Sequence, residues 1–296
     1  MTESSDSQPA GEVKTLLVIL GPTGVGKTEY ALTQAELHQC PIINADSRQI
    51  YKDISIGTAA PTAAQLARVR HYFVHTLSLD QYYSAAMFEA EALSLLSRLF
   101  LTYDTVVMTG GSMMYIDAVT KGIDDIPTID DDLRATLRQR LETEGIDPLL
   151  RELRLIDPAY YAQVDLKNSR RIVHALEVCY QTGRPYSSFR RNMTKPRPFR
   201  IRKIGLRRQR DDLFNRINSR VDKMMEQGLL DEARRVYPLR HLNSLNTVGY
   251  KELFRVIDGE WELPMAVERI KKNTRVYAKK QMLWFSKDND IEWIDL

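Results

Sequence analysis

The stretch Gly21-Pro22-Thr23-Gly24-Val25-Gly26-Lys27-Thr28 (GPTGVGKT) decides how the rest of the chain is interpreted. It matches G-x-x-x-x-G-K-[ST], follows an apolar run at 14–20 typical of a buried strand, and precedes good helix formers at 28–38. In that context the glycines let backbone N–H groups surround phosphate oxygens, Lys27 adds a positive charge, and Thr28 offers a hydroxyl to Mg²⁺. The sequence therefore predicts a P-loop. The motif alone does not say whose phosphates it binds.

Two further apolar segments have the character of buried strands. The segment at 40–44 runs into Ala-Asp-Ser at 45–47, and the segment at 105–108 runs into Thr-Gly-Gly-Ser at 109–112. Strands that alternate with helices predict an α/β fold with a parallel sheet. Ligands bind at the carboxyl ends of such strands, so we expect Lys27, Asp46 and Ser112 to converge on one site.

The acid at position 46 is placed unusually for a P-loop protein. A P-loop NTPase normally carries an acidic residue at the end of a second buried strand, where it helps to hold Mg²⁺. Here the strand at 105–108 ends in TGGS without an acid, and Asp46 ends the other strand. Its carboxylate is able to hold a metal, accept a proton from a nucleophile, or cap a helix.

From about residue 121 the pattern becomes helical, and no convincing strand follows until 201–206. We therefore expect a P-loop α/β core at 13–120 and 200–296, an all-α insertion at 121–199, and a disordered polar tail at 1–12. In the insertion, Asn168 or Ser169 is expected to cap a helix ending at Thr182. Its buried stripe is Ile172, Leu176 and Cys179, while Arg170, Arg171 and His174 face solvent or a ligand.

A second helix is predicted from Asp211 to about Val236. Its inward face is formed at helical spacing by Leu213, Ile217, Val221, Met224 and Leu230. Arg220 lies on the same stripe. Because a guanidinium among apolar neighbours is costly when unpaired, Arg220 is expected either to pair with a core carboxylate or to face an anion site.

Composition limits the classes of function. The chain has 296 residues, 43% of them hydrophobic, and a net charge of +3, but 14 Lys or Arg and a single acid, Glu177, lie between Lys167 and Arg210. A run so basic is either a solvated face or, at this density, the contact surface for a polyanionic partner. Cys40 and Cys179 lack zinc or disulfide spacing, so two reduced structural thiols are expected. Without a signal peptide or a membrane-spanning segment, a cytoplasmic protein with no membrane partner is expected.

Ten ordered motifs resemble those of the bacterial tRNA dimethylallyltransferases, a P-loop tRNA isopentenyltransferase family. They are GPTGVGKT at 21, ADSRQIY at 45, IGTAAP at 56, YSAAMF at 83, TGGSMMY at 109, RRIVHALEV at 170, IGL at 204, RINSR at 216, TVGYKEL at 247 and TRVYAKKQMLWF at 274. The resemblance implies transfer of a dimethylallyl group from dimethylallyl diphosphate to N6 of adenine 37 in tRNAs reading codons that begin with U. It also implies binding of the tRNA anticodon stem-loop, and we expect a monomer.

The resemblance also implies roles for individual residues. Asp46 would take the proton from N6, Arg220 would stabilise the departing diphosphate, and Thr23 and Lys27 would assist. The diphosphate would lie on Gly21, Pro22, Thr23, Gly24, Val25, Gly26, Lys27 and Thr28, with Mg²⁺ on Thr28. Contacts to tRNA would come from Asp46, Ser47, Arg48, Gln49, Ser112, Arg134, Arg170, Arg171, Ile172, Val173, His174, Asn246, Thr247, Val248, Gly249, Tyr250, Lys251, Lys279, Lys280, Gln281, Met282, Leu283, Trp284, Phe285 and Ser286.

Some positions depart from the family pattern. Many members have a His-His pair where this chain has His71-Tyr72-Phe73, and the usual threonine of the GGT motif is Ser112. The hydroxyl at 112 is kept, whereas His71 receives no catalytic role. Two alternatives remain open: a small-molecule kinase that uses the P-loop for ATP, and a non-catalytic, nucleotide-gated RNA-binding protein.

Overall fold

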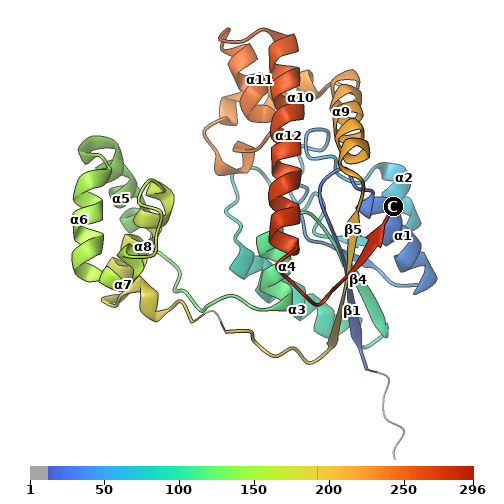
Figure 1. Cartoon of the computed structure of the whole chain (residues 1–296), viewed down its shortest axis with the longest axis horizontal. Helices are drawn as coiled ribbons and strands as arrows, with labels where there is room; N and C mark the ends of the chain where they lie inside the picture. The colour runs from blue at the N-terminus through green and yellow to red at the C-terminus, as the bar shows by residue number, and fades with distance from the viewer. Residues whose placement is uncertain (1–12, 192) are drawn as a thin grey trace, which may run out of the picture. The chain divides into compact units, whose positions relative to one another are not determined.

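The computed structural model describes residues 13–191 and 193–296, and within them the core is an α/β fold built on one parallel sheet. Figure 1 shows the sheet, whose six strands lie in the order β3-β2-β4-β1-β5-β6. The strands are β1 (Thr15–Leu20), β2 (Ile42–Asn44), β3 (His71–Tyr72), β4 (Thr105–Thr109), β5 (Arg200–Arg207) and β6 (Ile291–Asp295). All five neighbouring pairs are parallel. The predicted fold class is confirmed.

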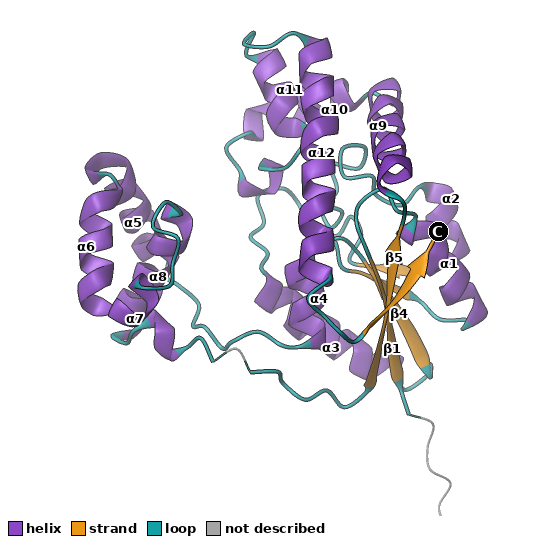
Figure 2. Ribbon diagram, in the orientation of Figure 1, coloured by secondary structure: helices purple, strands orange, loops and turns teal. Residues whose placement is uncertain are grey.

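The continuous apolar run of β1 follows from its central place, because both of its faces are covered. Leu16, Val18 and Leu20 pack in one apolar cluster, and Leu17 and Ile19 pack in the cluster on the opposite face. Figure 2 shows the helices on both sides of the sheet. The core helices are α1 (Lys27–Leu37), α2 (Ala63–Arg68), α3 (Ala85–Leu99), α4 (Met113–Thr120), α9 (Arg210–Glu226), α10 (Leu229–Val236), α11 (Tyr250–Ile257) and α12 (Leu263–Phe285).

The helix predicted from Asp211 to Val236 is in fact two helices, so that prediction was wrong. The chain leaves α9 at Gln227, and Gly228 has a φ of 95°, a left-handed conformation that glycine adopts without strain and that ends a helix. Leu213, Ile217, Val221 and Met224 are buried on α9 as expected. On α10 Leu229 is fully buried, whereas the predicted Leu230 is only partly buried.

Among the described residues, the core unit comprises 13–120 and Arg197–Leu296, and the insertion is a separate compact unit at Lys121–Pro196. Its helices are α5 (Asp131–Glu144), α6 (Ile146–Ile156), α7 (Pro158–Tyr161) and α8 (Ser169–Thr182). Asn168 caps α8 by accepting from the Arg171 N–H, and Gly183 ends the helix with a φ of 65°. Ile172, Leu176 and Cys179 are buried, as their spacing predicts.

Several details lay beyond the sequence-based prediction. β3 has two residues and β6 is only partly buried, so neither gives a clear strand pattern. Short 3₁₀ turns occupy Tyr186–Ser188, Tyr237–Leu239 and Asn243–Leu245. The tail predicted at 1–12 lies outside the described residues. Both cysteines are free and buried, as predicted, and no described helix is long and apolar enough to cross a bilayer.

Candidate active site

The phosphate loop joins β1 to the N-terminus of α1. Gly21 has a φ of 141° and Gly26 a φ of 115°, and a Cβ on Gly21 would lie 2.5 Å from the Leu206 carbonyl oxygen. Only glycine fits both positions without strain. The loop therefore leads directly into the positive end of an 11-residue helix, a ready site for an anion.

Two arginines hold the outer carbonyls of the loop. Arg216 donates from Nε to the Gly24 oxygen at 3.0 Å, and Arg208 donates from Nε to the Val25 oxygen at 2.9 Å. Arg208 also pairs with Asp212. Sequence reasoning gave neither arginine a role, although Arg216 lies four residues before Arg220 and therefore on the same face of α9.

Lys27 and Arg220 bring two positive charges to the loop. Lys27 Nζ donates to the carbonyls of Gly21 and Pro22 at 3.0 and 2.9 Å, and Arg220 Nη1 lies 3.3 Å from Thr23 Oγ1. Burial, together with the charge of Arg220, lowers the pKa of Lys27 to about 7, while Asp46 opposes that shift. Burial also lowers the pKa of Arg220. Within the described residues no carboxylate pairs with either cation, so the arrangement favours an anionic ligand over an internal ion pair.

Asp46 combines a structural and a chemical role. Its Oδ1 accepts from the N–H groups of Arg48 at 2.9 Å and Gln49 at 3.3 Å, which is the capping function considered from the sequence. Oδ2 makes no recorded hydrogen bond within the described residues and lies towards Gly111. One carboxylate oxygen therefore fixes the loop, and the other remains able to accept a proton.

The loops after β2 and β4 are locked together. Ser112 Oγ accepts from the Ser47 N–H at 2.7 Å and donates to Ser47 Oγ at 3.0 Å. The backbones are in close contact, because a Cβ on Gly110 would lie 2.1 Å from the Ala45 carbonyl oxygen. Ser112 is only 9% exposed, so its hydroxyl first of all positions the loop that carries Asp46.

Helix α12 closes the site from a third direction. The Gln281 side chain is fully buried, accepts from the Thr23 N–H at 2.8 Å and donates to the Gly111 oxygen at 2.8 Å. One turn earlier, the Tyr277 hydroxyl donates to the same oxygen at 3.3 Å. Burial and the charge of Asp46 raise the pKa of Tyr277 to about 12, so its hydroxyl stays protonated.

A cavity of about 1030 Å³ unites these groups. Its walls include Lys27, Asp46, Ser112 and Arg220, so the predicted convergence at the carboxyl ends of the strands is confirmed. His71 also lines the cavity, where burial lowers its pKa and its Nδ1 lies 2.8 Å from the Val69 carbonyl oxygen.

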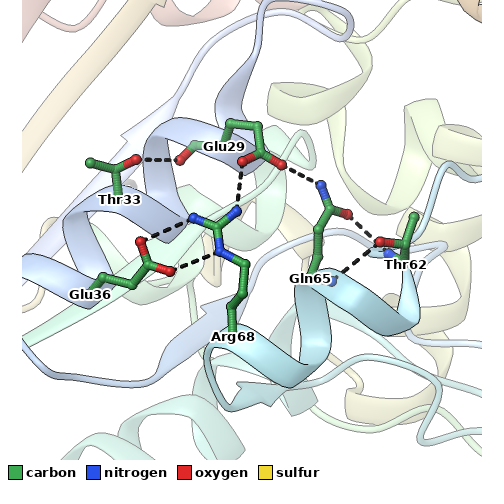
Figure 3. A network of polar contacts seen from close by, with 6 residues as sticks. All are labelled: Glu29, Thr33, Glu36, Thr62, Gln65 and Arg68. Atoms are coloured by element: carbon green, nitrogen blue, oxygen red, sulfur yellow. Dashed lines mark hydrogen bonds and ion pairs between the residues drawn. The ribbon is translucent and has the colours of Figure 1, made fainter.

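The outer side of α1 is tied to α2 by the polar network in Figure 3. Arg68 contacts Glu29 at 2.8 Å and binds Glu36 through two nitrogens at 2.8 and 3.0 Å. Gln65 donates to Glu29 at 2.6 Å and completes a capping box with Thr62. The network joins the helix of the phosphate loop to the segment that follows IGTAAP.

The residues expected to contact tRNA fall into two groups in the core unit. Asp46, Ser47, Arg48, Gln49, Ser112, Asn246, Thr247, Val248, Gly249, Lys251, Lys280 and Gln281 line the cavity. Lys279, Leu283, Trp284 and Ser286 are exposed on or after α12, and Met282 is half-buried. Trp284 Nε1 donates to Asp117 at 2.8 Å.

Four of the expected tRNA contacts need correction, because their side chains lie in the interior. Tyr250 is fully buried and its hydroxyl donates to Glu232 at 2.6 Å, while Phe285 packs in the core. Gln281 is occupied by the two loops, and Ile172 is fully buried in the insertion. These side chains support the framework and do not present a surface to RNA.

In the insertion, Arg170 and Arg171 are exposed at the start of α8. His174 is partly exposed and lies 3.3 Å from Glu177, and Val173 packs beside the insertion core. Arg134 pairs with Asp131 at 2.9 Å. A basic surface is therefore present at the first turn of α8, as the sequence predicts.

The donor set near the loop limits how a magnesium ion would bind. The described residues contain no cluster of three His, Cys, Asp or Glu side chains able to hold a metal. Thr28 is exposed at the first turn of α1. Because Mg²⁺ keeps several waters and often shares phosphate oxygens, this set suits an ion carried largely by a bound diphosphate.

The family model described as IPP transferase matches residues 49–288. The chain belongs to the IPP transferase family. The matched range begins after the phosphate loop and Asp46, so the geometry of those residues is an independent observation.

Two relatives match this chain over almost its whole length. A tRNA dimethylallyltransferase 1 of Phocaeicola vulgatus is 61% identical over 94% of this chain and 93% of the relative. A tRNA dimethylallyltransferase 2 of Parabacteroides distasonis is 62% identical over 95% of this chain and 94% of the relative. Among solved structures, a tRNA isopentenylpyrophosphate transferase of Bacillus halodurans has a TM-score of 0.67 and 34% identity, covering 95% of this chain and 89% of that one. A eukaryotic dimethylallyltransferase acting on tRNA has a TM-score of 0.78 and 25% identity, and the match covers 95% of this chain and 74% of that one.

Proposed function

We propose that this protein transfers the dimethylallyl group of dimethylallyl diphosphate to N6 of adenine 37 in tRNAs that read codons beginning with U. Relatives named tRNA dimethylallyltransferase at about 60% identity support the reaction class. The observation that carries the chemistry is one cavity lined by a phosphate loop, two cations without a carboxylate partner among the described residues, and the Asp46 carboxylate. A small-molecule kinase that uses the P-loop for ATP would give the carboxylate of Asp46 no role at this position.

In the proposed reaction, N6 attacks C1 of the dimethylallyl group and the bond from C1 to the diphosphate oxygen breaks. The proton of N6 passes to Asp46 Oδ2, while Oδ1 holds the loop in place. The leaving diphosphate keeps the electron pair of the broken bond. Lys27, Arg220 and the Thr23 hydroxyl face the charge that develops on it, and fixed charges in a buried site stabilise such charge strongly.

Magnesium is proposed as the cofactor. Thr28 would supply a hydroxyl, with the remaining ligands from diphosphate oxygens and water, and the ion would neutralise part of the diphosphate charge. Donor binding should therefore weaken when Mg²⁺ is removed with a chelator. Binding of tRNA at fixed ionic strength should change less.

The anticodon stem-loop is the proposed tRNA element. A base inside a stack cannot be reached, so the adenine must be extruded into the cavity while basic side chains hold the backbone. We propose that the exposed Arg170 and Arg171 contribute to that grip. Arg171→Glu should weaken tRNA binding and flatten its dependence on salt, because fewer counterions are released. Donor affinity should be unchanged; an equal loss for the donor contradicts the separation of the two surfaces.

The decisive test is incubation with labelled dimethylallyl diphosphate and unmodified tRNA, followed by nuclease digestion and mass spectrometry. The expected product is N6-isopentenyladenosine at position 37 together with diphosphate. ATP turnover on a small acceptor without transfer would support the kinase alternative instead. The non-catalytic RNA-binding alternative predicts no transfer by the wild type and a function that is left intact in Asp46→Ala, whereas we expect Asp46→Ala to bind tRNA and to lose transfer.

A further inference from the structure

Gln281 is a fully buried amide whose two ends reach different loops. Its Oε1 accepts from the Thr23 N–H and its Nε2 donates to the Gly111 carbonyl, each at 2.8 Å. The Thr23 nitrogen can only donate and the Gly111 oxygen can only accept, so a single orientation of the amide satisfies both. The side chain is therefore fixed in position and in orientation.

The two loops that it joins lie beside opposite ends of the proposed reaction. Thr23 lies beside Arg220, where the diphosphate departs. Gly111 lies beside the proton acceptor, because a Cβ on Gly111 would be 2.8 Å from Gln281 Nε2 and 3.6 Å from Asp46 Oδ2. The amide thus lies between the leaving-group side and the base side of the cavity.

We propose that Gln281 is a positioning residue that sets the separation between the phosphate loop and the loop of Gly111, to which the loop of Asp46 is locked through Ser112 and Ser47. The inference rests on the proposed function and adds to it a determinant of the transfer step. Because the Thr23 N–H is taken by Gln281, the part of Thr23 that serves the diphosphate is its hydroxyl. Tyr277 supports the same Gly111 carbonyl from the preceding turn of α12.

This role differs from a contact to tRNA. A side chain with no exposed surface offers nothing to RNA, so its loss should change the rate within the bound complex and not the affinity for tRNA. A misplacement of about 1 Å between reacting groups lowers rates by on the order of 10²-fold. The expected signature is a fall in kcat at an unchanged tRNA affinity.

Two variants test the inference. Gln281→Met keeps the length of the side chain but makes neither hydrogen bond. Gln281→Glu keeps the acceptor for the Thr23 N–H, loses the donor to Gly111 and adds a negative charge that repels the diphosphate. Gln227→Met and Gln227→Glu, at an exposed position between α9 and α10, are the matched controls. Single-turnover transfer, Kd for tRNA, Kd for the donor and thermal melting are measured for each.

For Gln281→Met we expect single-turnover transfer to fall on the order of 10²-fold with the Kd for tRNA kept. Gln281→Glu should also fall, with weaker donor binding in addition. A rate equal to the Gln227 controls overturns the inference. So does a raised Kd for tRNA at an unchanged saturated rate, or a loss of cooperative melting in both variants, which would assign Gln281 to RNA contact or to stability alone. Transfer by the wild type in the same assay tests the proposed function independently.

Discussion

Arg220, in the wall of the cavity, and Arg68, on the outer side of α1, are both fixed by neighbouring elements, but their partners differ. Arg68 is 39% exposed and forms ion pairs with Glu29 and Glu36, which raise its pKa (Figure 3). Arg220 is half-buried beside the Thr23 hydroxyl, and its desolvation lowers its pKa. Pairing with acids is what a structural cation needs, whereas a desolvated cation without such a pair is suited to an anionic ligand.

The largest effect is expected at Asp46, whose carboxylate lines the same cavity as Arg220. Asp46→Asn keeps an acceptor for the Arg48 N–H but cannot take a proton from N6. The transfer rate should fall about 10²–10⁴-fold while tRNA still binds. Rapid-quench transfer and a tRNA binding assay measure the two quantities, and Asp53→Asn, an exposed position, is the control. Near-normal transfer would leave Asp46 with its capping role alone.

Removal of the Arg220 guanidinium should have the next largest effect. Arg220→Met should lower kcat/KM for the donor about 10²–10³-fold, because a fixed charge is lost where the leaving group develops its own. The variant should melt no earlier than the wild type, since a partly desolvated charge that no carboxylate pairs with is removed. Steady-state kinetics and thermal melting give both numbers. A large loss of stability with normal kinetics would show that Arg220, like Arg68, serves the fold and not the reaction.

A pH profile sharpens the comparison further. The pKa of Lys27 is lowered to about 7, so the protonated form that attracts the diphosphate predominates below that pH. We therefore expect kcat/KM for the donor, which reports the free enzyme, to decline as the pH rises through about 7. In Arg220→Met the decline should move to higher pH, because the charge of Arg220 helps to lower the pKa. An unchanged pH profile in Arg220→Met would show that the charge of Arg220 does not affect the pKa of Lys27.

The smallest effect is expected at the paired arginine. Arg68→Met removes exposed ion pairs, which contribute little because solvent screens them. The melting temperature should drop slightly and transfer should be unchanged. If kcat/KM for the donor fell as it does in Arg220→Met, the network of Figure 3 would belong to the site and the contrast would fail.

The sequence predicted those parts of the fold that depend on local pattern. The glycine loop, the buried strands before Asp46 and Ser112, and the cap and stop of α8 each follow from neighbouring residues. The two-residue strand β3 and the edge strand β6 could not be predicted, since their pairing depends on distant segments. The break at Gly228 was missed because apolar spacing continues across it.

In the candidate site, too, local features could be predicted from the sequence and long-range contacts could not. Asp46 and Arg220 were identified from unusual placement, a carboxylate at a strand end and a guanidinium on an apolar stripe. The hydrogen bond between Gln281 and Thr23 joins residues that are 258 positions apart, so no local sequence pattern predicts it. Burial of Tyr250 and Phe285 likewise depends on packing between distant elements, which motif resemblance does not report.

The boundaries of the insertion have a consequence for the history of this architecture. Lys195 N donates to the Lys121 oxygen at 2.7 Å, and Arg197 donates to the carbonyls of Ala118 and Val119 at 2.8 Å. The chain therefore leaves and re-enters the core at adjacent points, with Glu89 held by the same arginine at 2.6 Å. Neighbouring ends of this kind let a whole domain be gained, exchanged or lost at one loop without rerouting its host.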